Sequence, residues 1–275
     1  MTNRLNHKVN VLRETLRELE RVVVAFSGGL DSTYLLKAAV DTLGPDNVVA
    51  LTALSESYPQ WEHEQARELA ELIGVKLIEV RTHEFERSEY RQNQGNRCYF
   101  CKSELFDAAW QHAKEHRLGH VCYGAIPDDL GDHRPGMVAA DEYAVHAPLI
   151  DAGITKDDIR LLSRDAELPT WNKPASACLA SRFPFGTEIT REGLAKVEAC
   201  ETVLMSLGFK VYRARYHEHL VRLELGQNEL DQVYADAHLR ETLLARCRAV
   251  GFDFVTIDLQ GYRTGSANHL VQING

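Results

Sequence analysis

The six-residue loop S-G-G-L-D-S at positions 27–32 constrains this chain more than any other stretch. It follows an apolar β-type run, residues 22–26, and leads into a helical pattern that begins at Thr33. Glycines let a backbone approach phosphate closely, and the N–H groups at the start of a helix attract anions. The loop lacks the Gly-Lys-Ser/Thr end of a Walker loop and the spacing of the dinucleotide fingerprint. It predicts a phosphate site whose candidate residues are Ser27, Gly28, Gly29, Asp31 and Ser32.

Around this loop, strand-like and helical patterns alternate along the first two thirds of the chain. The expected strands are 21–26, 48–54, 75–80, 120–125 and 143–150, and the expected helices are 1–20, 31–43, 60–73 and 101–117. Such alternation predicts an α/β fold with a doubly wound parallel sheet covered on both faces. Ligands bind at the carboxyl ends of such strands, where the first strand delivers the loop at 27–32.

After about residue 185 the pattern changes. We expect a helix at 191–207, strands at 210–216 and 220–225, a helix or broken helix at 227–250, and a strand at 252–259. This stretch is too short for a second doubly wound domain and predicts a small α+β domain. The predicted domains are therefore 1–188 and 189–275, with a loose tail from Thr264.

The composition excludes several classes of protein. A net charge of −9 argues against a nucleic-acid partner. No apolar run approaches the roughly 18 residues of a membrane span, and the amphipathic N-terminus does not resemble a signal peptide. Six cysteines without a signal do not indicate a disulfide framework. The cytoplasm is the expected location.

Cys178 lies in a loop, residues 171–186, that contains prolines, a glycine, Lys173 and Arg182. Neighbouring cations favour the nucleophilic thiolate form, so this loop predicts a functional cysteine. Structural cysteines are expected within apolar periodic runs, where three others lie: Cys122, Cys200 and Cys247.

Cys98 and Cys101 form a C-x-x-C motif at the start of a predicted helix. Such a pair is half of a zinc site, a redox pair, or two ligands of an iron–sulfur cluster. With Cys178 in the same cleft, three thiolates would fit a cluster that has one open iron. Two unrelated cysteines at a helix start remain the alternative.

Two further segments carry charged candidates. Asp128, Asp129, Asp132 and Arg134 follow the strand at 120–125, where carboxylates can hold Mg²⁺ and an arginine can clamp a phosphate or carboxylate. A solvated acidic loop is the alternative there. In the small domain one strand face carries three groups suited to a phosphate, and a neighbouring strand carries a weaker metal candidate: Arg213, Arg215 and His217, with Glu224. The alternative is an ordinary exposed strand face.

The order of four motifs resembles the LarE family of ATP-dependent sulfur transferases, which belong to the pyrophosphate-loop ATP pyrophosphatases. The motifs are S-G-G-x-D-S, N-R-C-Y-x-C-K, D-D-x-x-D-x-R-P-G and W-x-K-P-A-S-A-C-L-A-S-R-x-P-x-G. The first is shared by the whole superfamily, and the last is long and specific. The resemblance implies a sheet of the adenine nucleotide alpha hydrolase type and a homo-oligomer. The segment Ala125-Ile126-Pro127 departs from the family pattern, which puts a nucleotide contact there in doubt.

The implied reaction serves nickel-pincer cofactor biosynthesis. ATP and Mg²⁺, held in part by Asp31, adenylylate a carboxylate of a pyridinium dicarboxylate mononucleotide, and sulfur then replaces AMP. Asp129 and Arg134 are candidate cofactor-binding residues, the carboxylate through Mg²⁺ and the arginine through a phosphate or carboxylate. Arg213 and Arg215 resemble phosphate-binding arginines of the family. The sulfur comes either from Cys178 itself, which becomes dehydroalanine, or from a cluster bound by Cys98, Cys101 and Cys178, whose pattern resembles this second type. The alternatives are a tRNA thiolase and a non-catalytic adenine nucleotide sensor.

Overall fold

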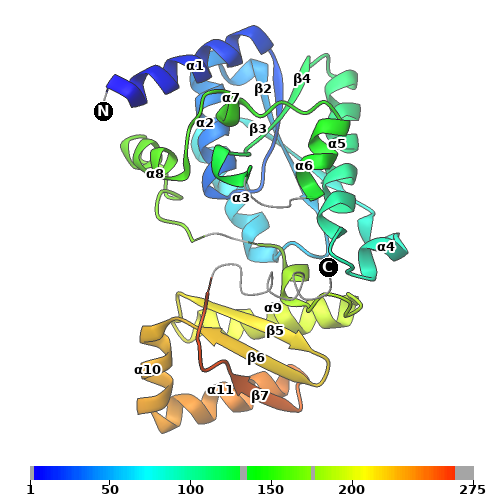
Figure 1. Ribbon diagram of the computed structural model, residues 1–275, viewed down its shortest axis with the longest axis vertical. Coiled ribbons are helices and arrows are strands. Elements are labelled where there is room, and N and C mark those ends of the chain that lie inside the picture. The colour runs from blue at the N-terminus through cyan, green and yellow to red at the C-terminus, as the bar shows by residue number, and fades with distance from the viewer. Residues whose placement is uncertain (1–2, 131–134, 175–176, 264–275) are drawn as a thin grey trace. The chain divides into compact units, whose positions relative to one another are not determined.

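The computed structural model describes residues 3–130, 135–174 and 177–263. The chain divides into two compact units, shown in Figure 1. The N-terminal unit comprises Met1–Arg87 and Asn96–Ser176, and the C-terminal unit comprises Ser88–Gly95 and Ala177–Gly275. The predicted domain boundary at 188/189 lies inside the C-terminal unit.

The N-terminal unit is built on a four-stranded parallel sheet with the strand order β3-β2-β1-β4. Its strands are β1 (Val22–Ala25), β2 (Val48–Leu54), β3 (Lys76–Arg81) and β4 (His120–Tyr123). Val22 at the start of β1 pairs with Val48 on one side and His120 on the other. The predicted parallel sheet is confirmed.

Helices cover both faces of this sheet, because successive side chains of a strand point to opposite sides. Val22 and Val24 pack with one group of helices, and Val23 and Ala25 pack with another. The first group is α1 (Asn3–Leu19), α2 (Leu30–Leu43), α3 (Gln60–Ile73) and α8 (Lys156–Asp165); the second is α5 (Arg97–Glu115) and α6 (Pro135–Glu142). Figure 1 shows α1 and α2 on one side of the sheet and α5 and α6 on the other. All four residues of β1 are therefore buried.

The direction of winding changes between β1 and β4. From β1 the chain proceeds through α2 to β2 and through α3 to β3, and it then returns through α5 to β4 on the other side of β1. The switch point therefore lies between β1 and β4, at the carboxyl ends of the strands, which is where open α/β sheets bind ligands.

The prediction of a strand at 143–150 is wrong. In this region α6 ends at Glu142, His146 forms a single parallel bridge with Cys122, and the short helix α7 (Pro148–Asp151) follows. Pro148 occupies a first-turn position, where its missing N–H costs no helical hydrogen bond. Sequence analysis also did not predict α8, whose start is marked by a capping box between Thr155 and Asp158.

The C-terminal unit contains a three-stranded mixed sheet with the order β5-β6-β7. Its elements are α4 (Ser88–Arg91), α9 (Arg191–Ser206), β5 (Tyr212–His217), β6 (Leu220–Leu225), α10 (Gln227–Ala235), α11 (Ala237–Ala249) and β7 (Phe254–Ile257). The predicted helix at 227–250 is broken at Asp236, whose side chain accepts hydrogen bonds from the first turn of α11. The small α+β fold is confirmed. The predicted tail at 264–275 lies outside the described residues.

Single-turn 3-10 helices connect several elements: Pro45–Asn47, Glu84–Glu86, Pro127–Asp129 and Leu179–Arg182. Cys122, Cys200 and Cys247 are fully buried in apolar cores, as predicted for structural cysteines. None of the six cysteines forms a disulfide. No helix among the described residues is long and apolar enough to cross a membrane.

Candidate functional site

The loop at 27–32 connects β1 to α2 at the point where the winding of the sheet changes. Gly28 has a φ of +61°, a left-handed conformation that favours glycine. A Cβ atom at Gly28 would lie 3.3 Å from the Cβ atom of Ala66 on α3. Gly29 is the N-cap of α2, and no side chain caps this helix. The first-turn N–H groups of α2 are therefore not occupied by a capping side chain, as a phosphate site requires.

Hydroxyl groups hold the shape of the loop. The Ser32 Oγ atom accepts a hydrogen bond from the Ser27 N–H at 3.3 Å, lies 3.1 Å from the Ser27 Oγ atom, and donates to the Gly29 carbonyl at 3.3 Å. The Tyr58 hydroxyl donates to the Ser27 carbonyl from the loop before α3. The two serines of the motif thus fix the backbone, while Ser27 itself stays exposed.

The end of β4 approaches this loop so closely that it requires glycine at position 124. A Cβ atom on Gly124 would lie 2.9 Å from the backbone N atom of Ser32 and 3.0 Å from its Cα atom. Real Cβ atoms do not come this close to backbone. Any side chain at position 124 would therefore displace the first turn of α2.

Asp31, the predicted magnesium ligand, forms an ion pair that sequence analysis missed. The Nζ atom of Lys156, at the start of α8, lies 2.8 Å and 2.6 Å from the two carboxylate oxygens. The pKa of the Asp31 carboxyl group is raised above its usual value, because the effect of burial outweighs the opposing effect of the ion pair with Lys156. Both side chains keep partial exposure, at 24% for Asp31 and 31% for Lys156. A capping box before position 156 was the only sequence signal for this helix start.

A second lysine lies against the loop. The Lys173 Nζ atom donates to the Gly28 carbonyl at 3.0 Å and to the Gln65 side chain, and lies 5.6 Å from the centre of the Trp61 ring. Burial lowers the pKa of the Lys173 ammonium group below its usual value. The sequence placed Lys173 near Cys178 along the chain, and the structure assigns it to the loop at 27–32 within the N-terminal unit.

The acidic segment after β4 accepts hydrogen bonds from two backbone N–H groups. The Asp129 carboxylate accepts a hydrogen bond from the Ile126 N–H at 3.1 Å, and the Asp128 carboxylate accepts one from the Lys156 N–H at 3.1 Å. Two residues of the segment that departs from the family pattern, Ala125 and Ile126, are buried in the two apolar cores that flank the sheet. In this chain their side chains therefore pack in the core. Two predicted residues, Asp132 and Arg134, lie outside the described residues.

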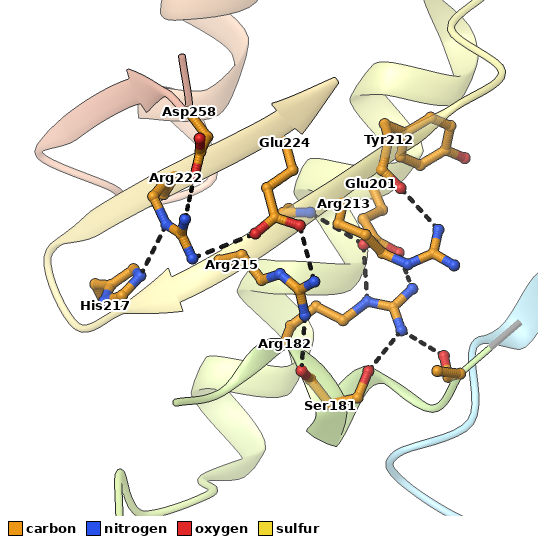
Figure 2. Close-up of polar contacts among 12 residues, drawn as sticks. Ser181, Arg182, Glu201, Tyr212, Arg213, Arg215, His217, Arg222, Glu224 and Asp258 are labelled. Atoms are coloured by element: carbon orange, nitrogen blue, oxygen red, sulfur yellow. Dashed lines mark hydrogen bonds and ion pairs between the residues drawn. The ribbon is translucent and has the colours of Figure 1, made fainter. Parts of the chain in front are cut away.

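In the C-terminal unit, Arg182 organises the backbone around Cys178. Figure 2 shows how Arg182 also meets Glu201. Its Nη1 atom donates to the carbonyl oxygens of Ala177 and Cys178, the latter at 3.0 Å. Its Nε and Nη2 atoms bind the two carboxylate oxygens of Glu201 on α9, each at 2.9 Å. Both side chains are about 95% buried. The two parallel bonds to Glu201 hold the guanidinium group of Arg182 in place. The Nη1 atom of that group therefore fixes the backbone that carries the half-buried Cys178 side chain.

Arg215 and Arg213 on β5 are bound within the C-terminal unit. Arg215 donates to Glu224 Oε2 at 2.8 Å and to the Ser181 carbonyl at 3.0 Å. Arg213 donates to the Tyr212 carbonyl at 2.7 Å, and burial lowers the pKa of its guanidinium group. Figure 2 shows both side chains extending toward Arg182. The sequence left an ordinary exposed strand face as the alternative here, but Arg215 is buried, because the carboxylate of Glu224 on the neighbouring strand pairs with it.

Glu224, the weaker metal candidate, is 1% exposed. Its second carboxylate oxygen lies 3.3 Å from Arg222, which also contacts Asp258 and His217. Metal binding by Glu224 stays a prediction, and the structure shows its charge balanced by two guanidinium groups.

Cys98 and Cys101 lie in the first two turns of α5, where a spacing of three residues puts both side chains on one helix face. Cys98 is exposed and Cys101 half-buried. A pair of thiols on one face fits two ligand positions of an iron–sulfur cluster or a zinc ion. Cys178 belongs to the other unit, and the three-cysteine cluster stays a prediction.

Comparison with known proteins supports this assembly of motifs. Residues 4–106 match the NAD synthase family. The chain is 42% identical to an uncharacterized protein of Synechocystis sp. over 97% of this chain and 99% of that protein. It is 35% identical to the pyridinium-3,5-bisthiocarboxylic acid mononucleotide synthase of Lactiplantibacillus plantarum over 95% of this chain and 94% of that enzyme. The similarity to the glutamine-dependent NAD(+) synthetase of Aquifex aeolicus, at 30% identity, covers only 32% of this chain and 16% of that protein.

Proposed function

The chain belongs to the LarE-like family of pyrophosphate-loop ATP pyrophosphatases, and from that premise we propose that it is an ATP-dependent sulfur transferase acting on a pyridinium mononucleotide. One observation carries the proposal: the S-G-G-L-D-S loop occupies the switch point of a chain that is similar along nearly its whole length to a pyridinium-3,5-bisthiocarboxylic acid mononucleotide synthase. The NAD synthases share the loop, but the match to that family ends at residue 106. The similarity that extends through Cys178 therefore favours sulfur over ammonia as the nucleophile that replaces AMP.

The first step is adenylylation of a substrate carboxylate. A carboxylate oxygen attacks the α-phosphorus of ATP, the bond to the bridging oxygen breaks, and pyrophosphate leaves with the bonding electrons. The first-turn N–H groups of α2 would bind the departing pyrophosphate, as preorganised donors stabilise developing charge. Lys156 and Lys173 border the same loop and would offset phosphate charge.

Asp31 is the proposed ligand of the magnesium ion that accompanies ATP. In the structure its carboxylate binds Lys156 through both oxygens. Because the pair is partly exposed, Lys156 can turn to a phosphate while Asp31 turns to the magnesium ion. We therefore assign Lys156 to the phosphate site together with Arg134, and Asp129 to the magnesium ion together with Asp31.

The second step replaces AMP with sulfur. In the route that consumes the protein, the Cys178 sulfur adds to the acyl carbon and AMP leaves with its bonding electrons. A base then removes the Cα proton of Cys178, the C–H electrons form the Cα=Cβ bond, and the Cβ–S electrons pass to sulfur. The products are a thiocarboxylate and dehydroalanine. In the catalytic route, a cluster held by Cys98, Cys101 and Cys178 would supply an added sulfide as the nucleophile.

The C-terminal unit is the proposed site of the substrate phosphate, through Arg213 and Arg215. Both guanidinium groups already have partners within the unit, so substrate phosphate would share or exchange these contacts. The proposed assembly is a homo-oligomer.

The test is pyrophosphate release from ATP in the presence of a pyridinium dicarboxylate mononucleotide. Wild-type protein should release pyrophosphate only when this substrate is present. The Cys178→Ala variant should still release pyrophosphate but should form no thiocarboxylate, because only the second step needs the thiol. If the protein binds ATP but releases no pyrophosphate with this substrate, it is a nucleotide sensor. If pyrophosphate release depends on tRNA, it is a tRNA thiolase.

Mass spectrometry and metal analysis after anaerobic purification separate the two sulfur routes. The consumed-protein route leaves a chain lighter by one H₂S at Cys178 and a protein without iron. The cluster route leaves the mass unchanged and gives iron and sulfide that disappear in the Cys98→Ala variant.

A further inference from the structure

A group of three potential metal ligands lies at the C-terminal end of α5, away from the cysteines at its start. His112 and Glu115 belong to the last turn of the helix, and His116 is its C-cap residue. We propose that His112, Glu115 and His116 form a binding site for a divalent transition-metal ion such as Zn²⁺. This site does not depend on the proposed sulfur transfer.

The geometry brings one ligand atom from each residue within 4.8 Å of the others. Among the described residues, this is the one group of three or more histidine, cysteine or carboxylate side chains that meets this distance. Residues three and four apart lie on one face of a helix. The helix continues to the last ligand, because the His116 N–H donates to the His112 carbonyl at 3.1 Å. The two imidazole rings lie 4.2 Å apart, centre to centre.

The ligand atoms need only a small adjustment to close around an ion. Bonds of about 2.1 Å in a tetrahedral site separate neighbouring ligand atoms by roughly 3.4 Å. Glu115 and His116 are exposed, and His112 is half-buried, so rotation of exposed side chains can supply the difference. Within the described part of the chain, none of the three side chains has a hydrogen bond or ion pair that binding would have to break.

Two imidazoles and one carboxylate select the class of ion. Imidazole nitrogen suits zinc, copper and nickel, whereas calcium and magnesium prefer sets of oxygen ligands. Three protein ligands leave at least one position open to water. The negative end of the α5 dipole also favours a cation at this place. The positive charge of Lys76 on β3 lies near His112 and would repel a bound metal ion. The Lys76 side chain is exposed, so it can turn away from the ion toward solvent.

One helix therefore presents different ligand sets at its two ends. Cys101 and His112 are eleven residues apart, which is about 16 Å along a helix that rises about 1.5 Å per residue. No single ion can bridge this distance. Metal bound by the whole protein would then divide between a sulfur site and a nitrogen and oxygen site, and the two can be told apart by their ligand atoms.

The test is calorimetric titration of the full-length protein, stripped of metal with EDTA, with zinc chloride. The matched control is His83→Ala, because His83 also has a glutamate three residues later, with its Nδ1 atom 3.3 Å from Glu86 Oε1, but belongs to no three-ligand group found in the described residues. To remove thiol binding, all variants are made in a Cys98→Ser/Cys101→Ser background. We expect one zinc equivalent in that background and in His83→Ala. His116→Ala and Glu115→Gln should each weaken binding about tenfold or more.

Cobalt substitution gives a second readout. Cobalt bound in the background that lacks Cys98 and Cys101 should show visible absorption without the thiolate charge-transfer band. Zinc binding that is unchanged in His116→Ala, or that vanishes entirely when the two cysteines are replaced, would overturn the proposal. Because Glu115 and His116 are exposed, the fold of these variants should be retained, and circular dichroism checks this.

Discussion

The ion pairs beside the candidate site residues are held in opposite ways in the two units. In the N-terminal unit, Lys156 and Asp31 form a partly exposed pair beside a loop of backbone N–H groups. In the C-terminal unit, Arg182 and Glu201 are almost fully buried, and each guanidinium hydrogen bond has a fixed acceptor. Charges that keep some contact with water can change partners at low cost, whereas buried charges depend on their partners. We infer that the first pair exchanges with ligands and that the second holds the Cys178 backbone in place.

The largest expected effect is on stability, from replacing Glu201. The Glu201→Ala change removes the carboxylate that binds two nitrogens of buried Arg182 and also accepts a hydrogen bond from the Ala214 N–H at 3.1 Å. Removing one partner of a buried pair costs about 3–5 kcal/mol. Urea unfolding should report this loss. Glu192→Ala, which breaks an exposed pair with Lys196, is the control and should have no measurable effect. Similar stability of the two variants would contradict the comparison.

The second effect should fall on activity. Lys156→Ala removes the cation beside Asp31, and we expect pyrophosphate release to fall about 100-fold, the usual loss for one preorganised group that stabilises developing charge. The free energy of unfolding should change by about 1 kcal/mol or less, because the pair is partly exposed. Lys37→Ala breaks an exposed pair with Asp41 on α2 and should change neither quantity. If Lys156→Ala lowers the free energy of unfolding but leaves the rate of pyrophosphate release unchanged, Lys156 has a structural role and does not belong to the phosphate site.

The third prediction concerns the close approach of β4 to the loop. Gly124→Ala forces a Cβ atom to within 2.9 Å of the Ser32 N atom, and overpacking of this kind costs about 1–3 kcal/mol. Pyrophosphate release should fall as well, because the first turn of α2 must move. In the control Gly119→Ala, the nearest atom to the new methyl group would lie at 3.7 Å, an ordinary contact. Thermal unfolding and the release assay compare the two variants, and equal behaviour would refute the packing argument.

The smallest expected effect is a shift in pH dependence. Burial lowers the pKa of Lys173 below its usual value, so its positive charge is lost at a lower pH than that of an exposed lysine. If this cation supports the loop through Gly28, pyrophosphate release should decline as pH rises through the lowered pKa. Arginine stays charged, so Lys173→Arg should move the decline to higher pH. Lys37→Arg is the control. An unmoved alkaline limb in Lys173→Arg would show that another group controls it.

Much of the fold could be predicted from local pattern. Short apolar runs and helical periodicity located β1, β2, β3, α2 and α3, because each buried element of a parallel sheet carries its own signal. The stretch at 143–150 misled because apolar residues there pack against the sheet through a single bridge and a proline-started helix. Short apolar runs do not distinguish a strand from such a connection.

The candidate site divides in the same way. Ser27 to Ser32 could be identified from sequence, since a turn that binds phosphate needs particular residues in consecutive positions. Lys156 could not, because it lies 125 positions from Asp31 and nothing in its own neighbourhood specifies that contact. The buried ion pair of Arg215 with Glu224 was missed for a related reason, since alternation along β5 predicts a shared face but not what covers it.

The amino-acid sequence by itself was enough to predict the parallel sheet, the loop at 27–32 as a candidate phosphate site, and which three cysteines are structural, because each of these depends on neighbouring residues. Only the tertiary structure showed that Lys156 and Lys173 contact the loop at 27–32 and that position 124 has no room for a side chain. It also showed that Arg182 binds the backbone carbonyl groups on either side of the Cys178 Cα atom. These contacts join segments far apart in the chain, and they arise only when the sheet and its covering helices bring those segments within hydrogen-bonding distance.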